Sequence, residues 1–430
     1  MSSLLNSTGP CANNRNVAFT DARPVAARRV PSVRRTSQNV VCAADKQEEQ
    51  RPSIGDIVRS CALGLAAAAC VATPFTFAPP ELMPLAEARL TAGDPVKNAR
   101  ALLRYALPIK NESARRIQTA LEGISESLRI PGSKAVGPIQ SAVRKSKSVL
   151  NNDKTKIIAD FAPQNKEAGL KAIAALDKCL EEFSVLLDAK DKQEIPIKQQ
   201  EALGYVGQIE EAMVKGFPYE VPAQYANLPQ LKGRATVDMK IKLKEVRQDG
   251  VEGGNLKIVV DGFNAPVTGG DFIDLVHRGF YNNMEIQRAD GFIVQTGDPG
   301  PPDNGFREGD HVRRIPFEVM VKGDKAPFYE ETLEDAGRYN AEPVLPFNAY
   351  GTMALARGEF EPNSGSSQVF WLLKESELTP SGANLLDGRY AVFGYVVEGQ
   401  DLLTQLQVGD LITEAKVTDG LEYLEAPKVT

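Results

Sequence analysis

The spacing of apolar residues changes once along this 430-residue chain, near residue 233, and the change limits what the chain can fold into. Between about 95 and 215, apolar residues recur every three or four positions, which is the period of an amphipathic helix. After residue 233, apolar and polar residues alternate, beginning with the four apolar residues between 237 and 243. That is the period of a strand with one buried face. We therefore expect an α+β multidomain protein, with an all-α part followed by a β-rich part.

Five helices are predicted in the first of these parts. They cover about 95–107, 111–128, 138–150, 164–190 and 196–215. Asp94-Pro95 and Asn111 are expected to start the first two, because a side-chain acceptor or a proline suits the first turn. The clearest helix is 164–190, whose apolar face carries Leu170, Ile173, Leu176, Leu180, Phe183 and Leu187. Such faces need partners, so we expect a helical bundle over 89–216. A leucine zipper over 170–187 is the alternative, although it falls short of the roughly three to four heptads required.

A linker and a barrel are predicted to follow. Residues 217–233 contain three prolines, and their Phe217, Tyr219 and Tyr225 suggest that the linker packs on a domain. The later strands are expected at 256–260, 284–289, 292–296, 352–356, 369–373, 391–397 and 411–418, with helices from Thr268 and at 400–406. Many strands with two helices fit a closed β-barrel with flanking helices over 234–430.

Charge is distributed unevenly along the chain. Residues 1–88 hold nine Lys and Arg against seven Asp and Glu, residues 89–232 hold 22 against 17, and residues 233–430 hold 19 against 32. The acidic C-terminal part argues against nucleic acid as a partner, because phosphates would be repelled. Four of the five cysteines precede residue 89 and the chain has two histidines, so we expect no metal site and no cofactor.

The first 88 residues are predicted to be a targeting signal in two parts. Residues 1–44 are rich in Arg and Ser and contain one acid, which is typical of a chloroplast transit peptide; a disordered basic tail is the alternative. Residues 45–88 contain a short apolar run from Cys61 to Val71 and then Ala86-Glu87-Ala88, which is typical of a cleaved secretory-type signal. This double signal resembles the targeting of the chloroplast thylakoid lumen. An uncleaved membrane anchor is the alternative; once processed, the chain is not expected to be an integral membrane protein.

Three motifs in order carry a resemblance to a known family. The first is Tyr281–Pro299, with Arg-Ala-Asp-Gly-Phe-Ile-Val-Gln at its centre. The second is Gly351–Arg357 with Ser366–Trp371, and the third is Leu386–Gly394. Together they resemble the cyclophilin family of peptidyl-prolyl isomerases over about residues 234–430. The resemblance implies a closed barrel with an apolar pocket for a substrate proline on its side. It also implies an arginine that donates to the prolyl amide and so lowers the roughly 20 kcal/mol barrier to rotation.

The resemblance assigns the pocket residues position by position. Those that match the family are Phe292, Gln295, Ala356, Gln368 and Phe370, the last as the floor of the proline pocket. Those that replace a commoner residue are Ile293 for methionine, Arg357 for asparagine, Leu385 for tryptophan and Tyr390 for histidine.

The catalytic arginine departs from the family pattern. Counting back from Phe292 puts Gln287 at its position, and Arg288 stands one residue late. Because neighbours on a strand point to opposite faces, Arg288 is expected to point away from the pocket unless a β-bulge turns it. Arg288 is then either a surface ion-pair residue or a substituted catalytic arginine. We expect weak or absent isomerase activity.

An acidic insertion is predicted at about 303–346, because the connection from Asp298 to Gly351 is longer than in compact members of the family. Long connections of this kind are usually functional or disordered. The insertion is either a lobe that binds a partner or a solvated loop.

The whole layout resembles the multidomain thylakoid-lumen cyclophilins. The resemblance implies a chaperone or assembly factor for photosystem II that binds lumenal loops of its core proteins, with a thylakoid phosphatase as a further partner. Two alternatives are an active prolyl isomerase acting on lumenal proteins and a structural subunit of the oxygen-evolving machinery.

The targeting signal makes a first prediction. Cleavage is expected after Ala88, because small residues there follow the apolar run, so that the mature chain begins at Arg89. N-terminal sequencing of protein isolated from its compartment tests this. A mature N-terminus near residue 45 would contradict delivery to the lumen.

Overall fold

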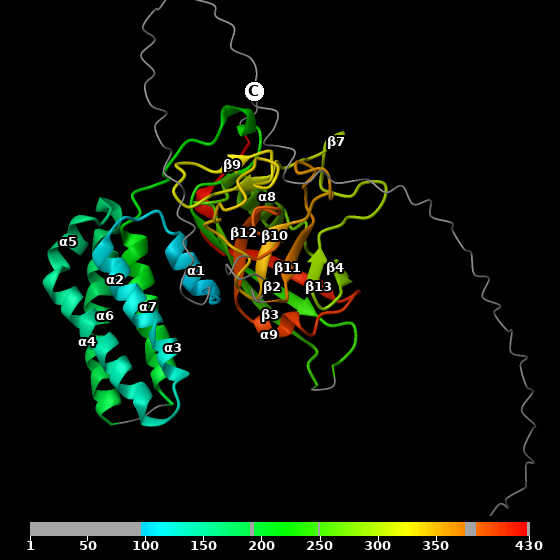
Figure 1. The fold of residues 1–430 in the computed structure, drawn as a ribbon. Coiled ribbons are helices and arrows are strands. Elements are labelled where there is room, and N and C mark those ends of the chain that lie inside the picture. The colour runs from blue at the N-terminus through cyan, green and yellow to red at the C-terminus, as the bar shows by residue number, and fades with distance from the viewer. Residues whose placement is uncertain (1–95, 190–192, 248–249, 375–383, 428–430) are drawn as a thin grey trace, which may run out of the picture. The chain divides into compact units, whose positions relative to one another are not determined.

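The computed structural model describes residues 96–189, 193–247, 250–374 and 384–427 (Figure 1). The predicted targeting segments 1–44 and 45–88 lie outside these residues. The described chain begins with helices and continues into a closed barrel, so the predicted α+β organisation is confirmed. Among the described residues, no helix combines the length and the apolar character needed to cross a membrane.

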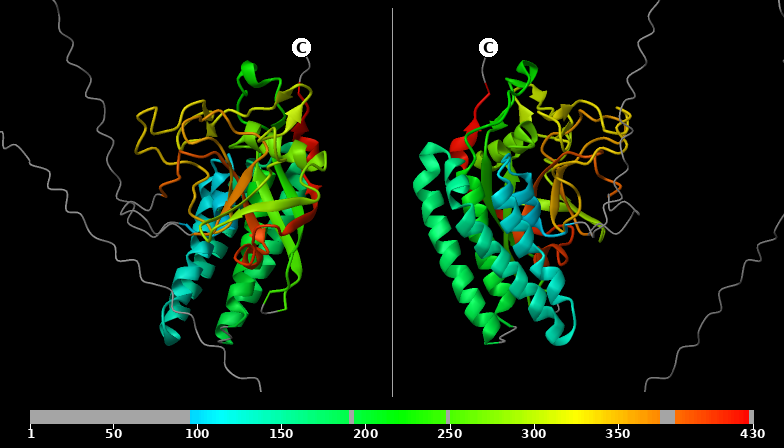
Figure 2. Two further views of the ribbon diagram at one scale, coloured as in Figure 1. Left: turned by 90° about the vertical axis from the view of Figure 1, so that its right-hand side faces the viewer. Right: turned by 60° about the vertical axis from the view of Figure 1, so that its left-hand side comes forward.

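The helical part is organised around one hydrophobic core. Its helices are α2 (Glu112–Glu122), α3 (Ile124–Leu128), α4 (Val136–Asn152), α5 (Lys154–Ala159), α6 (Lys166–Asp188) and α7 (Ile195–Ala212). The long ones lie side by side in the views of Figure 2. Leu176, Leu180 and Leu187 of α6 are buried in the shared core, whereas Leu170 is 41% exposed. The apolar face of α6 therefore belongs to a bundle, as predicted, and not to a leucine zipper.

Side-chain capping determines where the first two helices begin. Asn111 caps α2 as predicted, since its side-chain oxygen accepts from the amide of Ala114 at 2.9 Å. The helix expected to continue to residue 128 is interrupted at Gly123. The predicted start at Pro95 is also wrong. The helix α1 (Ala99–Ala106) begins after Asn98, whose side chain accepts from the amide of Ala101 at 3.0 Å and supplies a closer N-cap.

The helix α1 does not join the core of the bundle, contrary to the prediction. Its Ala99, Leu102, Leu103 and Ala106 belong to the hydrophobic cluster of the barrel. Barrel side chains also satisfy carbonyls in its last turn: Arg234 donates to that of Leu103, and Asn264 donates to that of Ala106 at 2.9 Å. These carbonyls have no partner within the helix, so the barrel completes the end of α1.

Eight strands close the barrel in the order β10-β11-β5-β4-β13-β2-β3-β12, with every neighbouring pair antiparallel. Their bounds are β2 (Arg234–Lys242), β3 (Gly253–Asp261), β4 (Met284–Ala289), β5 (Ile293–Thr296), β10 (Thr352–Leu355), β11 (Val369–Leu372), β12 (Val392–Glu398) and β13 (Leu411–Asp419). Side chains that point inward, such as those of Val237, Val294 and Trp371, are fully buried. The predicted strands match these bounds to within about three residues because alternation follows the pleat.

Smaller elements flank the barrel. They are α8 (Pro266–His277), α9 (Gln400–Leu403) and the paired strands β1 (Gln230–Leu231) and β14 (Leu424–Glu425). The linker packs on the barrel part as predicted. Tyr219 donates to the carbonyl of Phe263 at 2.8 Å, and Tyr225 is buried in the same hydrophobic cluster as the barrel.

The insertion is an ordered lobe, so the solvated-loop alternative is wrong. Two hairpins run through it, β6 (Arg307–Glu308) with β7 (His311–Val312) and β8 (Glu318–Val319) with β9 (Phe328–Tyr329). A small core of its own contains Phe317, Val319, Val321 and Leu333. Binding of a partner by the lobe stays a prediction.

Buried charges attach the lobe to α8. The carboxylate of Glu318 is fully buried and accepts from the amides of Val267 and Thr268, at 3.2 and 2.8 Å, in the first turn of α8. These amides carry the partial positive charge of a helix N-terminus and suit an anion. The guanidinium of Arg313, 3% exposed, lies 2.7 Å from carboxylate oxygens of both Asp271 and Asp274 on the same helix.

The bundle contains a buried carboxylate, Glu210 of α7. One of its oxygens lies 3.3 Å from the guanidinium of Arg115, and the other has no hydrogen-bond partner among the described residues. Burial raises the pKa of Glu210 from 4.5 to about 7, against the lowering effect of Arg115 and Arg104. The charged form is therefore destabilised in the folded bundle.

The raised pKa of Glu210 predicts how the stability of the folded protein depends on pH. The folded protein binds a proton at Glu210 more tightly than the unfolded chain does, so the contribution to stability is present below pH 4.5 and is lost as pH rises to about 7. The change amounts to roughly 3 kcal/mol at most. In urea unfolding followed by helical circular dichroism, Glu210→Gln is expected to exceed the wild type in stability at pH 8 and to match it more closely at pH 5. A Gln variant less stable than the wild type at pH 8 would mean that the pairing with Arg115 outweighs burial.

Candidate functional site

Five of the predicted site residues lie on three adjacent strands of the barrel. They are Gln287 and Arg288 on β4, Ile293 and Gln295 on β5, and Phe370 on β11. Gln295 pairs with Phe370 and Ile293 pairs with Leu372, while the alternate residues Val294 and Thr296 are fully buried. Residues directly opposite on antiparallel strands share a face. The register therefore places Ile293, Gln295 and Phe370 together on the outer face of the barrel wall.

A chain of side-chain amides crosses this face. The amide nitrogen of Gln295 donates to the side-chain oxygen of Gln368 at 2.7 Å. Gln368 in turn donates to the backbone carbonyl of Asn304 at 2.8 Å. The two glutamines fix each other's orientation, and the insertion lobe fixes that of the second. A peptide backbone that binds beside Phe370 would meet amide groups that are already oriented.

Aromatic rings surround Phe370, whose side chain is 4% exposed. The ring of Phe347 is stacked on it with centroids 6.1 Å apart, and the ring of Tyr390 meets it edge-on at 5.4 Å. Sequence reasoning found Phe370 and Tyr390 but missed Phe347. Phe347 comes directly after the insertion, where no periodic pattern marks it.

Arg357 braces this aromatic group and does not point freely outward. Its guanidinium lies 4.9 Å from the centre of the Tyr390 ring. It also donates to the carbonyls of Arg389, Gly358 and Glu359, at 2.8, 2.7 and 2.9 Å. Most of its donors are therefore engaged with the backbone, so that Arg357 holds two loops together beside Tyr390.

The register between β4 and β5 decides where Arg288 lies. Ile286 pairs with Thr296 but Arg288 pairs with Gln295, so a β-bulge at Gln287 inserts one extra residue. Arg288 thus stands directly opposite Gln295 and shares its face, which is the exception that the alternation rule allowed. The side chain of Gln287 instead donates to the carbonyl of Asp298 at 2.9 Å. A count along the chain could not detect the bulge, because a bulge is a property of two paired strands.

The guanidinium of Arg288 is held by Asp290 in the hairpin turn, at 2.6 Å. The amides of Ile293 and Phe292 also donate to Asp290, each at 2.9 Å. These amides and Arg288 together hold the pKa of Asp290 below its usual range. Both side chains are more than one-third exposed, so the ion pair is weak and reversible. Arg288 can therefore leave Asp290 at small cost.

The remaining predicted residues are less closely tied to this group. The amide of Ala356 donates to the carbonyl of Gln368 at 2.9 Å, which keeps Ala356 beside the glutamines. Phe292 lies at the hairpin and is 38% exposed, and Leu385 is 60% exposed. For Phe292 and Leu385, a role in binding stays a prediction.

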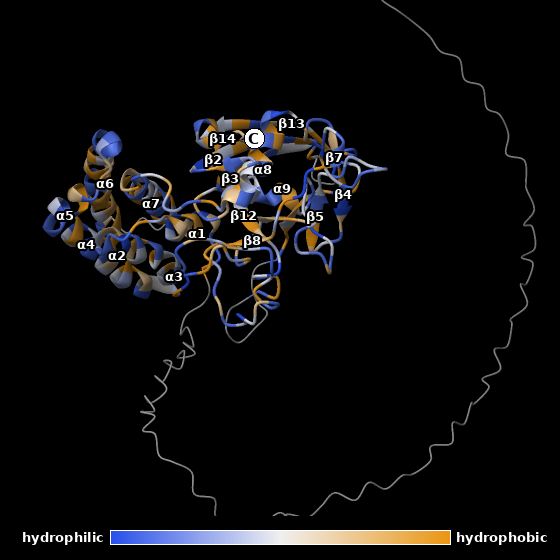
Figure 3. Cartoon of the chain, turned by 90° about the horizontal axis from the view of Figure 1, so that it is seen from above, coloured by the Kyte–Doolittle hydropathy of each residue, from blue (hydrophilic) through white to orange (hydrophobic). Residues whose placement is uncertain are grey.

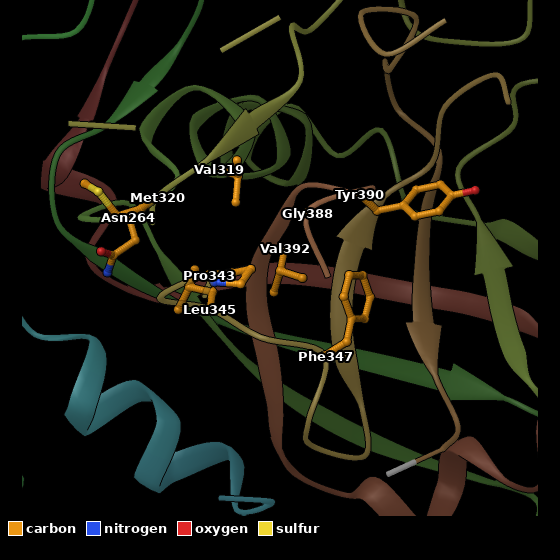
Figure 4. A pocket seen from close by; sticks show the side chains of 9 residues that line it. All are labelled: Asn264, Val319, Met320, Pro343, Leu345, Phe347, Gly388, Tyr390 and Val392. Atoms are coloured by element: carbon orange, nitrogen blue, oxygen red, sulfur yellow. The ribbon is translucent and has the colours of Figure 1, made fainter. Parts of the chain in front are cut away.

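A small cavity lies beside the aromatic group, between Phe347, Tyr390 and residues of the lobe (Figure 4). Val319, Met320, Pro343, Leu345 and Val392 contribute to its walls. Its volume of about 10 Å³ is enough for one water molecule and too small for a prolyl ring. This cavity therefore cannot hold the ring of a substrate proline, and binding of proline at Phe370 stays a prediction.

Comparison with known proteins fits both parts of the chain. Residues 98–214 match a family model described as the PsbQ-like domain of CYP38-like peptidyl-prolyl cis-trans isomerases, and residues 244–422 match the model of cyclophilin-type isomerases. A chloroplastic isomerase of Arabidopsis thaliana, CYP38, is 49% identical over 86% of each chain. The chain belongs to the cyclophilin family.

Two further relatives show how far the cyclophilin layout extends. A putative thylakoid lumen isomerase of Synechocystis is 43% identical over 79% of this chain and 87% of its own. The chloroplastic CYP37 of Arabidopsis thaliana is 31% identical over 76% of this chain and 70% of its own. The predicted multidomain lumenal cyclophilin is thus confirmed, as is its location in the chloroplast thylakoid lumen.

The β-bulge predicts that substitutions of Arg288 and of Gln287 will affect the isomerase rate differently. If Arg288 donates to the prolyl amide, Arg288→Ala should lower whatever isomerase rate the protein has by about 100-fold, the usual effect of removing one such donor. Gln287→Ala removes the neighbouring side chain, which donates to the carbonyl of Asp298, and should leave the rate near that of the wild type. Exchange between cis and trans signals of a proline peptide, measured by NMR, detects even slow rates. Equal losses in the two variants would refute the assignment.

Proposed function

We propose that this lumenal cyclophilin is a chaperone or assembly factor for photosystem II that binds proline-containing lumenal segments with weak or no isomerase activity. The proposal rests on a difference between two groups of side chains on the outer face of the barrel wall, one suited to binding and one to catalysis. The binding part, Phe370 with Gln295 and Gln368, is fully assembled. The catalytic part depends on Arg288, whose guanidinium is paired with Asp290.

The chemistry of the face supports a proline-containing ligand. The buried ring of Phe370 offers an apolar floor, and the two oriented glutamines offer donors and acceptors to a backbone. A proline residue exposes an apolar ring beside a backbone carbonyl. Phe370 can contact the ring, and the glutamine side chains can bind the backbone. The proposed clients are lumenal loops of photosystem II core proteins, and a thylakoid phosphatase is a further proposed partner.

Two other functions compete with this one. An active isomerase is favoured by the bulge that places Arg288 opposite Gln295, because only a weak ion pair keeps its guanidinium from a substrate. A structural subunit of the oxygen-evolving machinery is favoured by the match of residues 98–214 to a PsbQ-like model. Stoichiometric co-purification with mature photosystem II would favour the structural subunit.

Binding of paired peptides tests the proposal. A labelled peptide from a proline-containing lumenal loop is titrated with the processed chain, beside the same peptide with alanine in place of proline. The proline peptide is expected to bind more tightly because only its ring offers an apolar surface that can pack on Phe370. Gln368→Ala should weaken binding about tenfold, the loss of one or two hydrogen bonds.

The control is Gln200→Ala, which removes an exposed glutamine of α7 and should leave the affinity unchanged. Equal affinity of the proline and alanine peptides would remove the proposal. A fast wild-type isomerase rate alongside proline-dependent binding would replace the first function with the second.

A further inference from the structure

The bundle divides its charge between two pairs of helices, and neither the comparisons nor the proposed site accounts for this. From 136 to 159, which spans α4 and α5, the chain has five Lys and Arg residues and one acid, Asp153. Across α6 and α7 it has four basic and eight acidic residues. The basic excess therefore lies on α4 and α5, whose hydrophilic segments appear blue in Figure 3.

The exposed basic residues lie on α2, α4 and α5, three helices that contact one another. Arg144, Lys145, Lys154 and Lys156 are all exposed, and Arg116 of α2, which packs on α4 and α5, is 56% exposed. We call these five residues the basic face. Between them on α4 the exposed positions are small and polar: Ser141, Ser148, Asn151 and Asn152. These positions recur at helical spacing, so they lie along one side of a helix about 25 Å long.

Internal pairing does not neutralise the basic face. The side chain of Asp153 is only 14% exposed and binds Ser113, Lys156 and Arg116. Two exposed acids, Glu112 and Asp160, stand four residues from Arg116 and Lys156 in the sequence. Within the described part of the chain, no acidic side chain pairs with Arg144, Lys145 or Lys154. On α6 two of the three exposed lysines are paired instead: Lys171 lies 2.7 Å from Glu167, and Lys178 lies 3.8 Å from Glu182. The basic face thus keeps a positive field that an anionic partner can neutralise.

The basic face lacks large exposed apolar side chains, and this indicates what kind of partner it binds. Specific protein interfaces depend on a few buried apolar or aromatic anchors surrounded by polar contacts. None of the exposed large apolar side chains of the described residues belongs to α4 or α5. A layer of anionic lipid headgroups needs no such anchor, because it attracts Lys and Arg side chains wherever they reach the surface. The lumen in which the chain resides is enclosed by a membrane that can supply such a layer.

From this geometry we infer that the basic face binds the surface of an anionic lipid bilayer reversibly and through charge alone. The contact is peripheral, holds the protein at the membrane, and is separate from the peptide-binding face of the barrel. It is sensitive to salt because exposed charges are screened over about 10 Å at moderate ionic strength.

Co-sedimentation with vesicles tests the inference. The processed chain is mixed with vesicles of phosphatidylcholine alone or of phosphatidylcholine with phosphatidylglycerol, at low and high salt. Binding is expected only to the anionic vesicles and only at low salt. Neutralising three charges with Arg144→Gln, Lys145→Gln and Lys154→Gln should lower the partition coefficient about 100-fold, at about fivefold for each charge.

A matched variant separates the basic face from net charge. Lys166→Gln, Lys171→Gln and Lys178→Gln remove the same number of exposed charges from α6 and should leave the partition coefficient unchanged. Circular dichroism confirms that both variants keep their helices. Equal losses in the two variants, or binding that does not require anionic lipid, would overturn the inference. So would a wild-type chain that ignores vesicles but binds polyglutamate through Arg144, Lys145 and Lys154, because the partner would then be an acidic polypeptide.

Discussion

Pairing of β5 with its two neighbours fixes the candidate site, because a strand of a closed barrel cannot slip by one residue without turning its buried side chains outward. Val294 and Thr296 are fully buried, which fixes Gln295 and Ile293 on the opposite face. The pairing with β11 then places Phe370 beside Gln295, and the bulged pairing with β4 brings in Arg288. The burial of interior residues thus determines, through register, the composition of an exterior surface.

The insertion lobe contributes contacts to this exterior surface. Asn304 orients Gln368, and Phe347, at the far end of the same connection, is stacked on Phe370. The lobe is fastened to α8 by Glu318 and Arg313, both buried and both paired with charges or dipoles. Removing one partner of such a pair leaves an uncompensated buried charge, at a cost of several kcal/mol. The position of the lobe, and with it the orientation of the glutamines, is therefore strongly constrained.

Much of the fold could be predicted because hydrophobic period is a local property. The strand 284–289 and the helix around 166–188 follow directly from spacing. Features that depend on pairing between distant segments could not be predicted. An amphipathic α1 does not reveal which core will bury it, and the bulge at Gln287 exists only relative to β5. The sequence motifs identified Phe370, Gln295 and Gln368 as site residues. Phe347 and Asn304 lie in a connection without a periodic pattern, so the motifs did not identify them.

The proposed function requires proline-containing segments to bind on the outer face of β5 and β11. Chemical-shift mapping tests it most directly, with the isotope-labelled processed chain titrated by a proline-containing lumenal peptide. The largest shifts are expected on the amides of Gln295, Gln368 and Phe370, and they are expected to fade when alanine replaces the proline. Shifts confined to the helical bundle, or shifts at these three amides that are indifferent to the proline, would contradict it.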